Sequence, residues 1–259
     1  MKCIFKADDF GLSHGINVAI IDAYVNGPIK NAGVMINMPA VKEAIDLSVK
    51  YPKLSLGLHV NVSVGYPICN YSNVKSLLNK DNKFHSSSYC REKIRKGYDP
   101  FPIYEEIEKE VEAQILRYYE MIGRYPDYID AHAIHSTNLF RALSYCAKKY
   151  NIVHYSYEEG LSNNIIVYPY RAVPPYEFYS QGIEPFEYFT KDYCNILNKD
   201  YALLFMHPGY IDYELYNRTS YIKVRTQDLY ALTHKKTREW LKKNNIESIT
   251  YKEIEEGNK

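Results

Sequence analysis

Cysteine is scarce in this sequence, and neither charge is in clear excess. Five cysteines are dispersed through 259 residues without a C-x-x-C pair, and 32 basic residues nearly balance 31 acidic ones. Scattered cysteines in odd number argue against a disulfide framework or a thiolate metal site, so we expect reduced thiols in the core. A net charge of +1 gives no indication of a nucleic-acid partner or of binding to an anionic membrane.

Long hydrophobic runs are also absent. No stretch approaches the length of a transmembrane helix, and Asp8 and Asp9 precede any apolar stretch as long as a signal peptide requires. We therefore expect a cytoplasmic protein without a membrane partner. With 46% hydrophobic residues, the chain of 259 residues is long enough for one domain, 1–259, around a single core.

Segments typical of strands and helices alternate about seven times along the chain. The predicted strands are Cys3–Phe5, Ala32–Met38, Leu54–Asn61, Tyr128–His132, Ile152–Tyr155, Tyr201–Met206 and Glu247–Thr250. Apolar residues recur at helical spacing between most of them, which favours parallel strands joined by helical crossovers. Polar residues follow many of the strands, and a barrel gathers strand ends around one mouth. The pattern predicts an α/β fold, a distorted TIM-like (β/α) barrel of about seven parallel strands.

The interval between the third and fourth predicted strands is unusually long. Residues 63–102 are polar and irregular, and an amphipathic helix follows, with apolar residues at four-residue spacing from Ile103 to Tyr119. Loops of this length inside a domain are usually functional, often as a lid over a site. We therefore expect an irregular insertion around 63–102. Further along, Phe186–Leu197 is predicted to be helical, and Thr226–Lys243 to form one or two helices.

Polar residues with metal-binding or catalytic potential stand at or just after the predicted strand ends. They are Asp8, Asp9, His59, Asp130, His132 and His207. Because the carboxyl ends of parallel strands lie on the same side of a barrel, we expect these side chains to face one another. A carboxylate with two or three imidazoles is a typical open site for zinc or a similar divalent ion. The remaining histidines, His14, His85, His154 and His234, have no such placement.

The two adjacent carboxylates allow a second interpretation. Asp8 and Asp9 repel each other, and a nearby cation or a proton would offset one of the charges. Alternatively, Asp9 caps the helix that follows and Asp8 is merely solvated. Each histidine taken singly is also compatible with an ordinary hydrogen-bonded side chain. The metal-site prediction therefore depends on the joint occurrence of these residues at four strand ends.

Five blocks of the sequence together match one known family. They are Ala7–Ser13, Val34–Ala40, Gly57–Asn61, Asp130–His132 and His207–Gly209. In their order and spacing, over most of the chain, they resemble the YdjC-type carbohydrate deacetylases, a family that includes chitooligosaccharide deacetylases. The resemblance implies a distorted (β/α) barrel that removes acetyl groups from N-acetylated sugars with the help of a metal ion. It also implies a small carbohydrate as the substrate.

The resemblance implies roles for individual residues as well. Asp9, His59 and His132 would hold one divalent metal ion. Asp8 would be the general base that activates the metal-bound water, and His207 would be the general acid or the group that steadies the intermediate. Further residues expected around the metal or the substrate are Asn61, Asp130, His135 and Arg225. Two imidazole ligands favour zinc and carboxylate and water ligands suit magnesium, so both ions stay open.

One block departs from the family pattern. Members commonly show D-x-H-x-H-x-H, whereas here Ile134 replaces the middle histidine and the last one, His135, is displaced by one position. The first histidine, His132, is kept. His135 could act as a ligand, as a partner behind the ligands, or simply as the start of the next helix. The departure bears on substrate preference more than on metal binding.

Two other functions are compatible with the same residues. One is another metal-dependent barrel hydrolase, for example a phosphoester hydrolase, although no cluster of lysine or arginine follows the strand ends to neutralise a phosphate. The other is a sugar-binding homologue without turnover, although pure binding needs the ligand Asp9 and not the base Asp8. We expect a homodimer, the commonest assembly of soluble enzymes.

Overall fold

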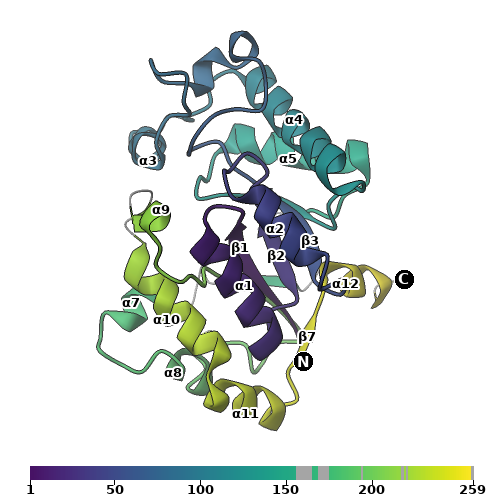
Figure 1. Cartoon of the computed structure of the whole chain (residues 1–259), viewed down its shortest axis with the longest axis vertical. Helices are drawn as coiled ribbons and strands as arrows, with labels where there is room; N and C mark the ends of the chain where they lie inside the picture. The colour runs from purple at the N-terminus through teal and green to yellow at the C-terminus, as the bar shows by residue number, and fades with distance from the viewer. Residues whose placement is uncertain (156–164, 169–174, 194, 217–218, 220, 258–259) are drawn as a thin grey trace.

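A parallel β-sheet forms the centre of the protein, and β1 lies in its middle (Figure 1). The computed structural model describes all residues except 156–164, 169–174, 194, 217–218, 220 and 258–259. The strands are β1 (Lys2–Phe10), β2 (Asn31–Val34), β3 (Ser55–Val60), β4 (Ile129–Ala131), β5 (Ile165–Tyr168), β6 (Tyr201–Met206) and β7 (Glu247–Ile249). All their pairings are parallel, which confirms the α/β barrel class predicted from the sequence.

The strand order explains why the barrel is distorted. Six strands follow one another as β4-β3-β2-β1-β6-β5, and β7 pairs with the first residues of β1, Lys2–Ile4. Further along β1, the partner is β2. Asn31 joins the two partners, because its Nδ2 donates to the carbonyl of Ile249 at 2.9 Å and its Oδ1 accepts from the amide of Tyr251. Within the described ranges, no pairing connects β4 with β5.

Helices cover the sheet on its outer side. They are α1 (His14–Asn26), α2 (Val41–Ser48), α4 (Tyr104–Ile122), α5 (Thr137–Tyr150), α7 (Pro175–Tyr179), α8 (Glu187–Thr190), α9 (Tyr213–Tyr216), α10 (Ile222–Thr233), α11 (Lys235–Lys243) and α12 (Tyr251–Gly257). In Figure 1, α1 and α2 lie in front of the sheet, with α10 and α11 to one side and α4 and α5 at the opposite end. Local signals set their ends: the Ser136 side chain caps α5, and Gly123, with φ of 81°, ends α4.

Besides β1, three predicted elements differ clearly from the structure. The strand expected at Ile152–Tyr155 is reduced to one bridge between Val153 and Tyr128, and β5 lies later, in a segment without a clear pattern. The helix expected at Phe186–Leu197 is confined to α8, because Asp192 and Asn195 adopt positive φ values that a helix cannot accommodate. Strand β2 ends at Val34 because the next residues turn, with the amide of Met38 bonded to the carbonyl of Met35.

The insertion at 63–102 is more ordered than predicted. It contains two short 3₁₀ helices, η1 (Tyr71–Asn73) and η2 (Lys75–Leu77), and the helix α3 (Ser87–Arg95). Carboxylates on α4 hold its backbone: Glu110 accepts from the amides of Ile68 and Cys69, both at 3.0 Å. The buried apolar side chains of the insertion include Val74, Leu77, Phe84, Cys90 and Phe101. These side chains belong to the main hydrophobic core, together with Ile107, Val111 and Ile115 of α4, so the insertion is packed as part of the domain.

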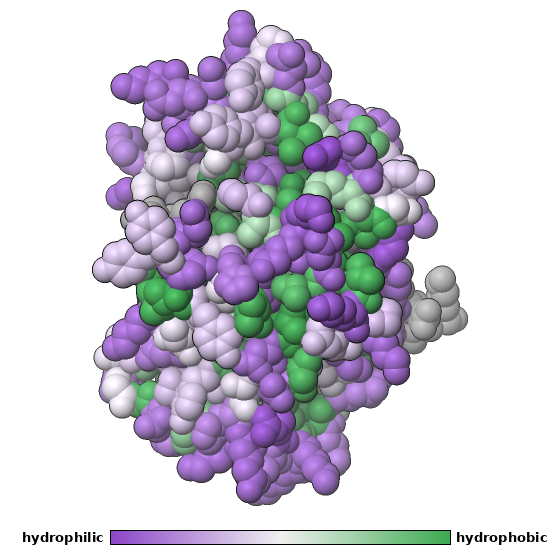
Figure 2. Space-filling model, viewed as in Figure 1, coloured by the Kyte–Doolittle hydropathy of each residue, from purple (hydrophilic) through white to green (hydrophobic). Residues whose placement is uncertain are grey.

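The visible face of the protein is mainly polar (Figure 2), and most of the described cysteines are buried. On the face shown in Figure 2, hydrophilic side chains predominate and apolar ones are interspersed with them. Cys3, Cys90 and Cys146 are buried thiols outside any disulfide, as expected, whereas Cys69 is only half-buried, and Cys194 lies outside the described residues. Among the helices described, none has the length and apolar character needed to cross a lipid bilayer.

Candidate active site

A β-bulge in β1 brings the two adjacent carboxylates into one site. The strand was predicted to end at Phe5, but it continues to Phe10 and includes Asp8 and Asp9. Ala7 pairs with Ala32 and Phe10 with Val34, so two residues of β1 stand opposite one residue of β2. Neighbouring side chains of a regular strand point to opposite faces, whereas a bulge re-aims them. Asp9 accordingly has a φ of 73°, and both carboxylates face His59.

This geometry rules out the alternative interpretation of the pair. Asp8 and Asp9 are 3% and 0% exposed, so neither is a solvated surface carboxylate. The cap of α1 is Ser13, whose side chain accepts from the amide of Ile16. Gly33, opposite the bulge, leaves the required space, because a Cβ there would lie 3.0 Å from Oδ1 of Asp8 and 3.1 Å from Cβ of His59.

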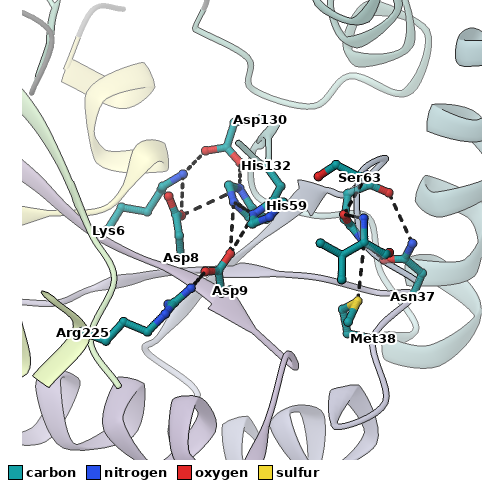
Figure 3. A network of polar contacts seen from close by, with 12 residues as sticks. Lys6, Asp8, Asp9, Asn37, Met38, His59, Ser63, Asp130, His132 and Arg225 are labelled. Carbon is teal, nitrogen blue, oxygen red and sulfur yellow. Dashed lines mark hydrogen bonds and ion pairs between the residues drawn. The ribbon is translucent and has the colours of Figure 1, made fainter. Parts of the chain in front are cut away.

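Three of the predicted ligand atoms converge on one point (Figure 3). Oδ1 of Asp9 lies 2.9 Å from Nδ1 of His132 and 3.6 Å from Nε2 of His59. The two imidazole nitrogens are 3.3 Å apart. Four ligands around a tetrahedral zinc ion, at about 2.0–2.2 Å from the metal, lie about 3.3–3.6 Å from one another. The spacing and the mixed oxygen and nitrogen donors therefore fit a divalent metal ion.

Oδ1 of Asp9, the proposed ligand atom, is also available to bind a metal ion. Although it is buried and close to His132, Oδ1 makes no aligned hydrogen bond, whereas Oδ2 is held by Nη2 of Arg225 at 2.5 Å. Burial by itself would raise the pKa of Asp9, but the charges of Arg225 and His132 outweigh it and hold the pKa well below its usual value. Asp9 is therefore a permanent carboxylate with one committed oxygen and one that points into the site.

Asp130 fixes the ring of His59. Its Oδ1 lies 2.7 Å from Nδ1 of His59, so Nε2 on the far side of the ring is the atom presented to Asp9. Burial favours the neutral forms of both groups. The charges of Asp8 and Asp130 nevertheless raise the pKa of His59, although Lys6 opposes them, and the charges of Lys6 and His59 lower the pKa of Asp130. Carboxylates bonded to metal-ligating histidines commonly fix the ring in this way.

His207 lies near this cluster, and its backbone is fixed by Asp228. Its backbone amide donates to Oδ2 of Asp228 at 2.8 Å, and Oδ1 of Asp228 accepts from the hydroxyl of Tyr179 at 2.9 Å. Burial lowers the pKa of His207 to about 4, although the charges of Asp9 and Asp8 act in the opposite direction. The imidazole is therefore neutral at neutral pH.

Two of the predicted residues lie outside the cluster. The side chain of Asn61 is bonded to Asn37, to the carbonyl of Val64 and to the amides of Ser63 and Val64. In Figure 3, Asn37 and Ser63 form a group of their own, away from Asp9. His135 belongs to neither candidate ligand group of the described chain, and it directly precedes the cap of α5, in line with its interpretation as the start of that helix.

Three residues of the site were not anticipated as functional: Lys6, Asp228 and Tyr179. Lys6 is buried between Asp8 and Asp130. Its position two residues before Asp8 on a strand was a usable signal, because such residues share a face. The sequence contains no comparable signal for Asp228 and Tyr179. The bond of Asp228 to His207 and the bond of Tyr179 to Asp228 depend on how separate helices pack.

The similarity to known proteins extends over nearly the whole chain. A family model described as YdjC-like protein matches residues 2–243. Carbohydrate deacetylase 2 of Listeria innocua is 30% identical over 259 residues, which cover 98% of this chain and 99% of the relative. The carbohydrate deacetylase of Halalkalibacterium halodurans is 33% identical over 242 residues, which cover 92% of this chain and 98% of the relative.

Solved structures share the fold. A protein from Enterococcus faecalis, described as a candidate for cellobiose-phosphate cleavage, superposes with a TM-score of 0.80 at 22% identity, covering 98% of both chains. A family 4 acetyl xylan esterase from Clostridium thermocellum gives a TM-score of 0.52 at 12% identity, covering 98% of this chain and 90% of that one. At these identities the likeness concerns the fold, and it agrees with the distorted barrel.

Proposed function

The chain belongs to the YdjC-like family, and from this membership we propose that it is a metal-dependent hydrolase that removes acetyl groups from N-acetylated sugars. Both relatives compared above are named carbohydrate deacetylases. The proposed substrates are small N-acetylated carbohydrates of the chitooligosaccharide type. The proposed cofactor is one divalent ion, zinc or magnesium.

The convergence of Asp9, His59 and His132 is the observation that supports this proposal most directly. One carboxylate oxygen and two imidazole nitrogens lie within 3.6 Å of one another, and a second carboxylate, Asp8, is the next residue. Three protein ligands are typical of a catalytic site, because they leave coordination positions for water and substrate. A site that only stored the ion would not require Asp8.

The proposed chemistry divides between the ion and the protein. A divalent ion held by Asp9, His59 and His132 would lower the pKa of water and polarise the acetyl carbonyl. Asp8, ion-paired with Lys6 at 2.7 Å, takes the proton of the attacking water as general base. It then returns the proton to the amide nitrogen as the C–N bond breaks, so that the sugar leaves as a neutral amine and the acyl group as acetic acid, which then gives up its remaining proton to water and becomes acetate.

His207 fits one of its two expected roles better than the other. With a pKa of about 4, it has no proton to transfer as an acid at neutral pH, but a neutral imidazole still has one N–H to donate. We assign it the stabilisation of the oxygen that becomes negative when water adds to the carbonyl. Arg225 and Asp130 then act as positioning residues for Asp9 and His59.

The alternative functions receive less support. Lys6 and Arg225, the latter expected near the site, do place two cations there, but each is paired with a carboxylate. Neither is therefore free to neutralise a phosphoester. A sugar-binding homologue without catalytic turnover would not need a general base, so this alternative does not explain the buried Asp8 at the site.

Acetate release from diacetylchitobiose by the purified protein tests the proposal. We expect release that EDTA abolishes and that added Zn²⁺ or Mg²⁺ restores. A panel of other N-acetylated sugars, assayed in parallel, separates a wrong sugar from a wrong reaction. No acetate from any of them under either metal would refute the proposed function.

A further inference from the structure

Lys6 is a buried cation next to the proposed metal centre. The residue is 2% exposed, and its Nζ lies 2.7 Å from Oδ1 of Asp8 and is ion-paired with Oδ2 of Asp130. The rings of Tyr128 and Phe205 flank the ammonium, with centroids at 5.7 and 5.8 Å. Four groups from β1, from β6 and from the segment at β4 thus enclose one positive charge. The two carboxylates raise the pKa of Lys6 despite its burial, so the ammonium stays charged.

The two sides of the His59 ring face two different sets of acidic groups. On the Nε2 side lie Asp9 and His132, the proposed metal ligands. On the Nδ1 side lie Asp130 at 2.7 Å and Asp8 at 3.8 Å. Each set, together with His59, places its potential ligand atoms within 4.8 Å of one another, as a metal site requires. The site therefore has two neighbouring cation positions that share one imidazole.

We propose that the ammonium of Lys6 permanently occupies the second cation position, so that the centre takes up one divalent ion and not two. The inference rests on the proposed function, which supplies the metal centre, and it explains why that centre binds a single ion. Paired metal sites hold ions about 3.5–4 Å apart, bridged by shared ligands, which is the kind of arrangement that Asp8, Asp130 and His59 would otherwise offer. A fixed ammonium occupies the oxygens of both carboxylates and repels a second divalent ion at short range.

The formal charges of the site agree with this assignment. Three buried or half-buried carboxylates, Asp8, Asp9 and Asp130, are matched by two fixed cations, Lys6 and Arg225. One negative charge is left over, which a single divalent ion more than offsets. A second ion would leave a large uncompensated positive charge in a buried site.

Metal stoichiometry in two variants of Lys6 tests the inference. Lys6→Ala removes both the charge and the volume of the side chain, whereas Lys6→Met keeps most of its packing against Tyr128 and Phe205 without the charge. Each protein is loaded with Mn²⁺, freed of excess ion by gel filtration, and analysed by elemental mass spectrometry. Electron paramagnetic resonance then distinguishes an isolated Mn²⁺ from a spin-coupled pair.

We expect one Mn²⁺ per wild-type chain and two, spin-coupled, in Lys6→Ala. We also expect two ions in Lys6→Met, because the inference attributes the exclusion to the charge of the ammonium and not to the volume of the side chain. Lys42→Ala, which removes an exposed lysine paired with Asp46, is the control and should keep one ion.

Three outcomes would contradict the inference. Two ions in the wild type, or one ion in folded Lys6→Met, would refute it while leaving the proposed function intact. Failure of the wild type to bind any divalent ion would instead remove the metal centre on which both proposals rest. If Lys6→Ala does not fold, the comparison of the wild type with Lys6→Met still decides, because one ion in each would leave the ammonium without a role.

Discussion

Oδ1 of Asp130 lies 2.7 Å from Nδ1 of His59, although the two residues are 71 positions apart in the chain. Parallel pairing of β3 with β4 places them opposite each other in the sheet. The contact leaves Nε2 of His59 as the atom that faces Asp9. A carboxylate on one strand thereby orients a proposed metal ligand on its neighbour.

Replacement of Asp130 should weaken metal binding without abolishing it. In Asp130→Asn, the ring of His59 loses its charged partner, and we expect a loss of about 10–100-fold in divalent-ion affinity. Competition with a chromogenic chelator measures the affinity. Asp127→Asn is the matched control, because Asp127 is also buried but bonds to Ser55 and Arg124. Equal affinity losses in the two variants would show that Asp130 has no specific effect on the metal.

Replacement of the proposed base should separate turnover from metal binding. Asp8→Asn is expected to keep the bound ion and to lose about 10²–10⁴-fold in kcat, the usual contribution of a general base. His59→Ala and His132→Ala should lose both the ion and activity. His14→Ala, which changes an exposed histidine near the start of α1, is the control. Wild-type turnover by Asp8→Asn would show that the base is another group.

Loss of Arg225 should destabilise the metal-free protein. The guanidinium is buried and bonded to Oδ2 of Asp9, so Arg225→Met leaves a buried carboxylate without its counter-charge. Removal of one partner from such a pair costs about 3–5 kcal/mol. Urea unfolding in EDTA measures the change. Arg117→Met, which removes a surface pair with Glu120, should change stability by less than about 1 kcal/mol. Similar values for both variants would mean that the Arg225 pair contributes little.

Asp228 should make stability depend on pH in the acid range. Burial raises its pKa from 3.8 to about 6, against hydrogen bonds from His207 and Tyr179 that lower it. The unfolded carboxyl releases its proton at lower pH than the folded one, so this group's contribution to stability falls between about pH 4 and 6 and is constant above. The difference between the two pKa values corresponds to about 3 kcal/mol.

Asp228→Asn removes this titration and keeps an oxygen for the amide of His207. The stability of the variant relative to wild type should therefore rise by up to about 3 kcal/mol from pH 4 to pH 6. Urea unfolding of both proteins in EDTA at several pH values measures the difference. Asp46→Asn, at an exposed position, should show no such rise. Parallel curves for Asp228→Asn and wild type would contradict the raised pKa.

Much of the fold could be predicted because its signals are local. β6 matches its predicted bounds, and β3 is within one residue of them at each end, since runs of apolar residues mark buried strands. The signal was weaker where pairing is short: Ile152–Tyr155 has an apolar pattern, yet only Val153 bridges to its neighbour. The prediction that the first strand ends at Phe5 was wrong, because the polar residues after it do not mark its end. β1 continues through Asp8 and Asp9, whose charges are compensated by ion pairs inside the protein.

The sequence by itself determined the class of the fold, the motif blocks and the strand ends at which Asp9, His59 and His132 stand. These follow from hydrophobic periodicity and from residue types close together in the chain. Only the tertiary structure decided how the charges are paired. The bulge depends on the register of β1 against β2, and Arg225 reaches Asp9 from 216 positions away. Such contacts arise from packing between distant segments, so a single sequence names the charged residues without naming their partners.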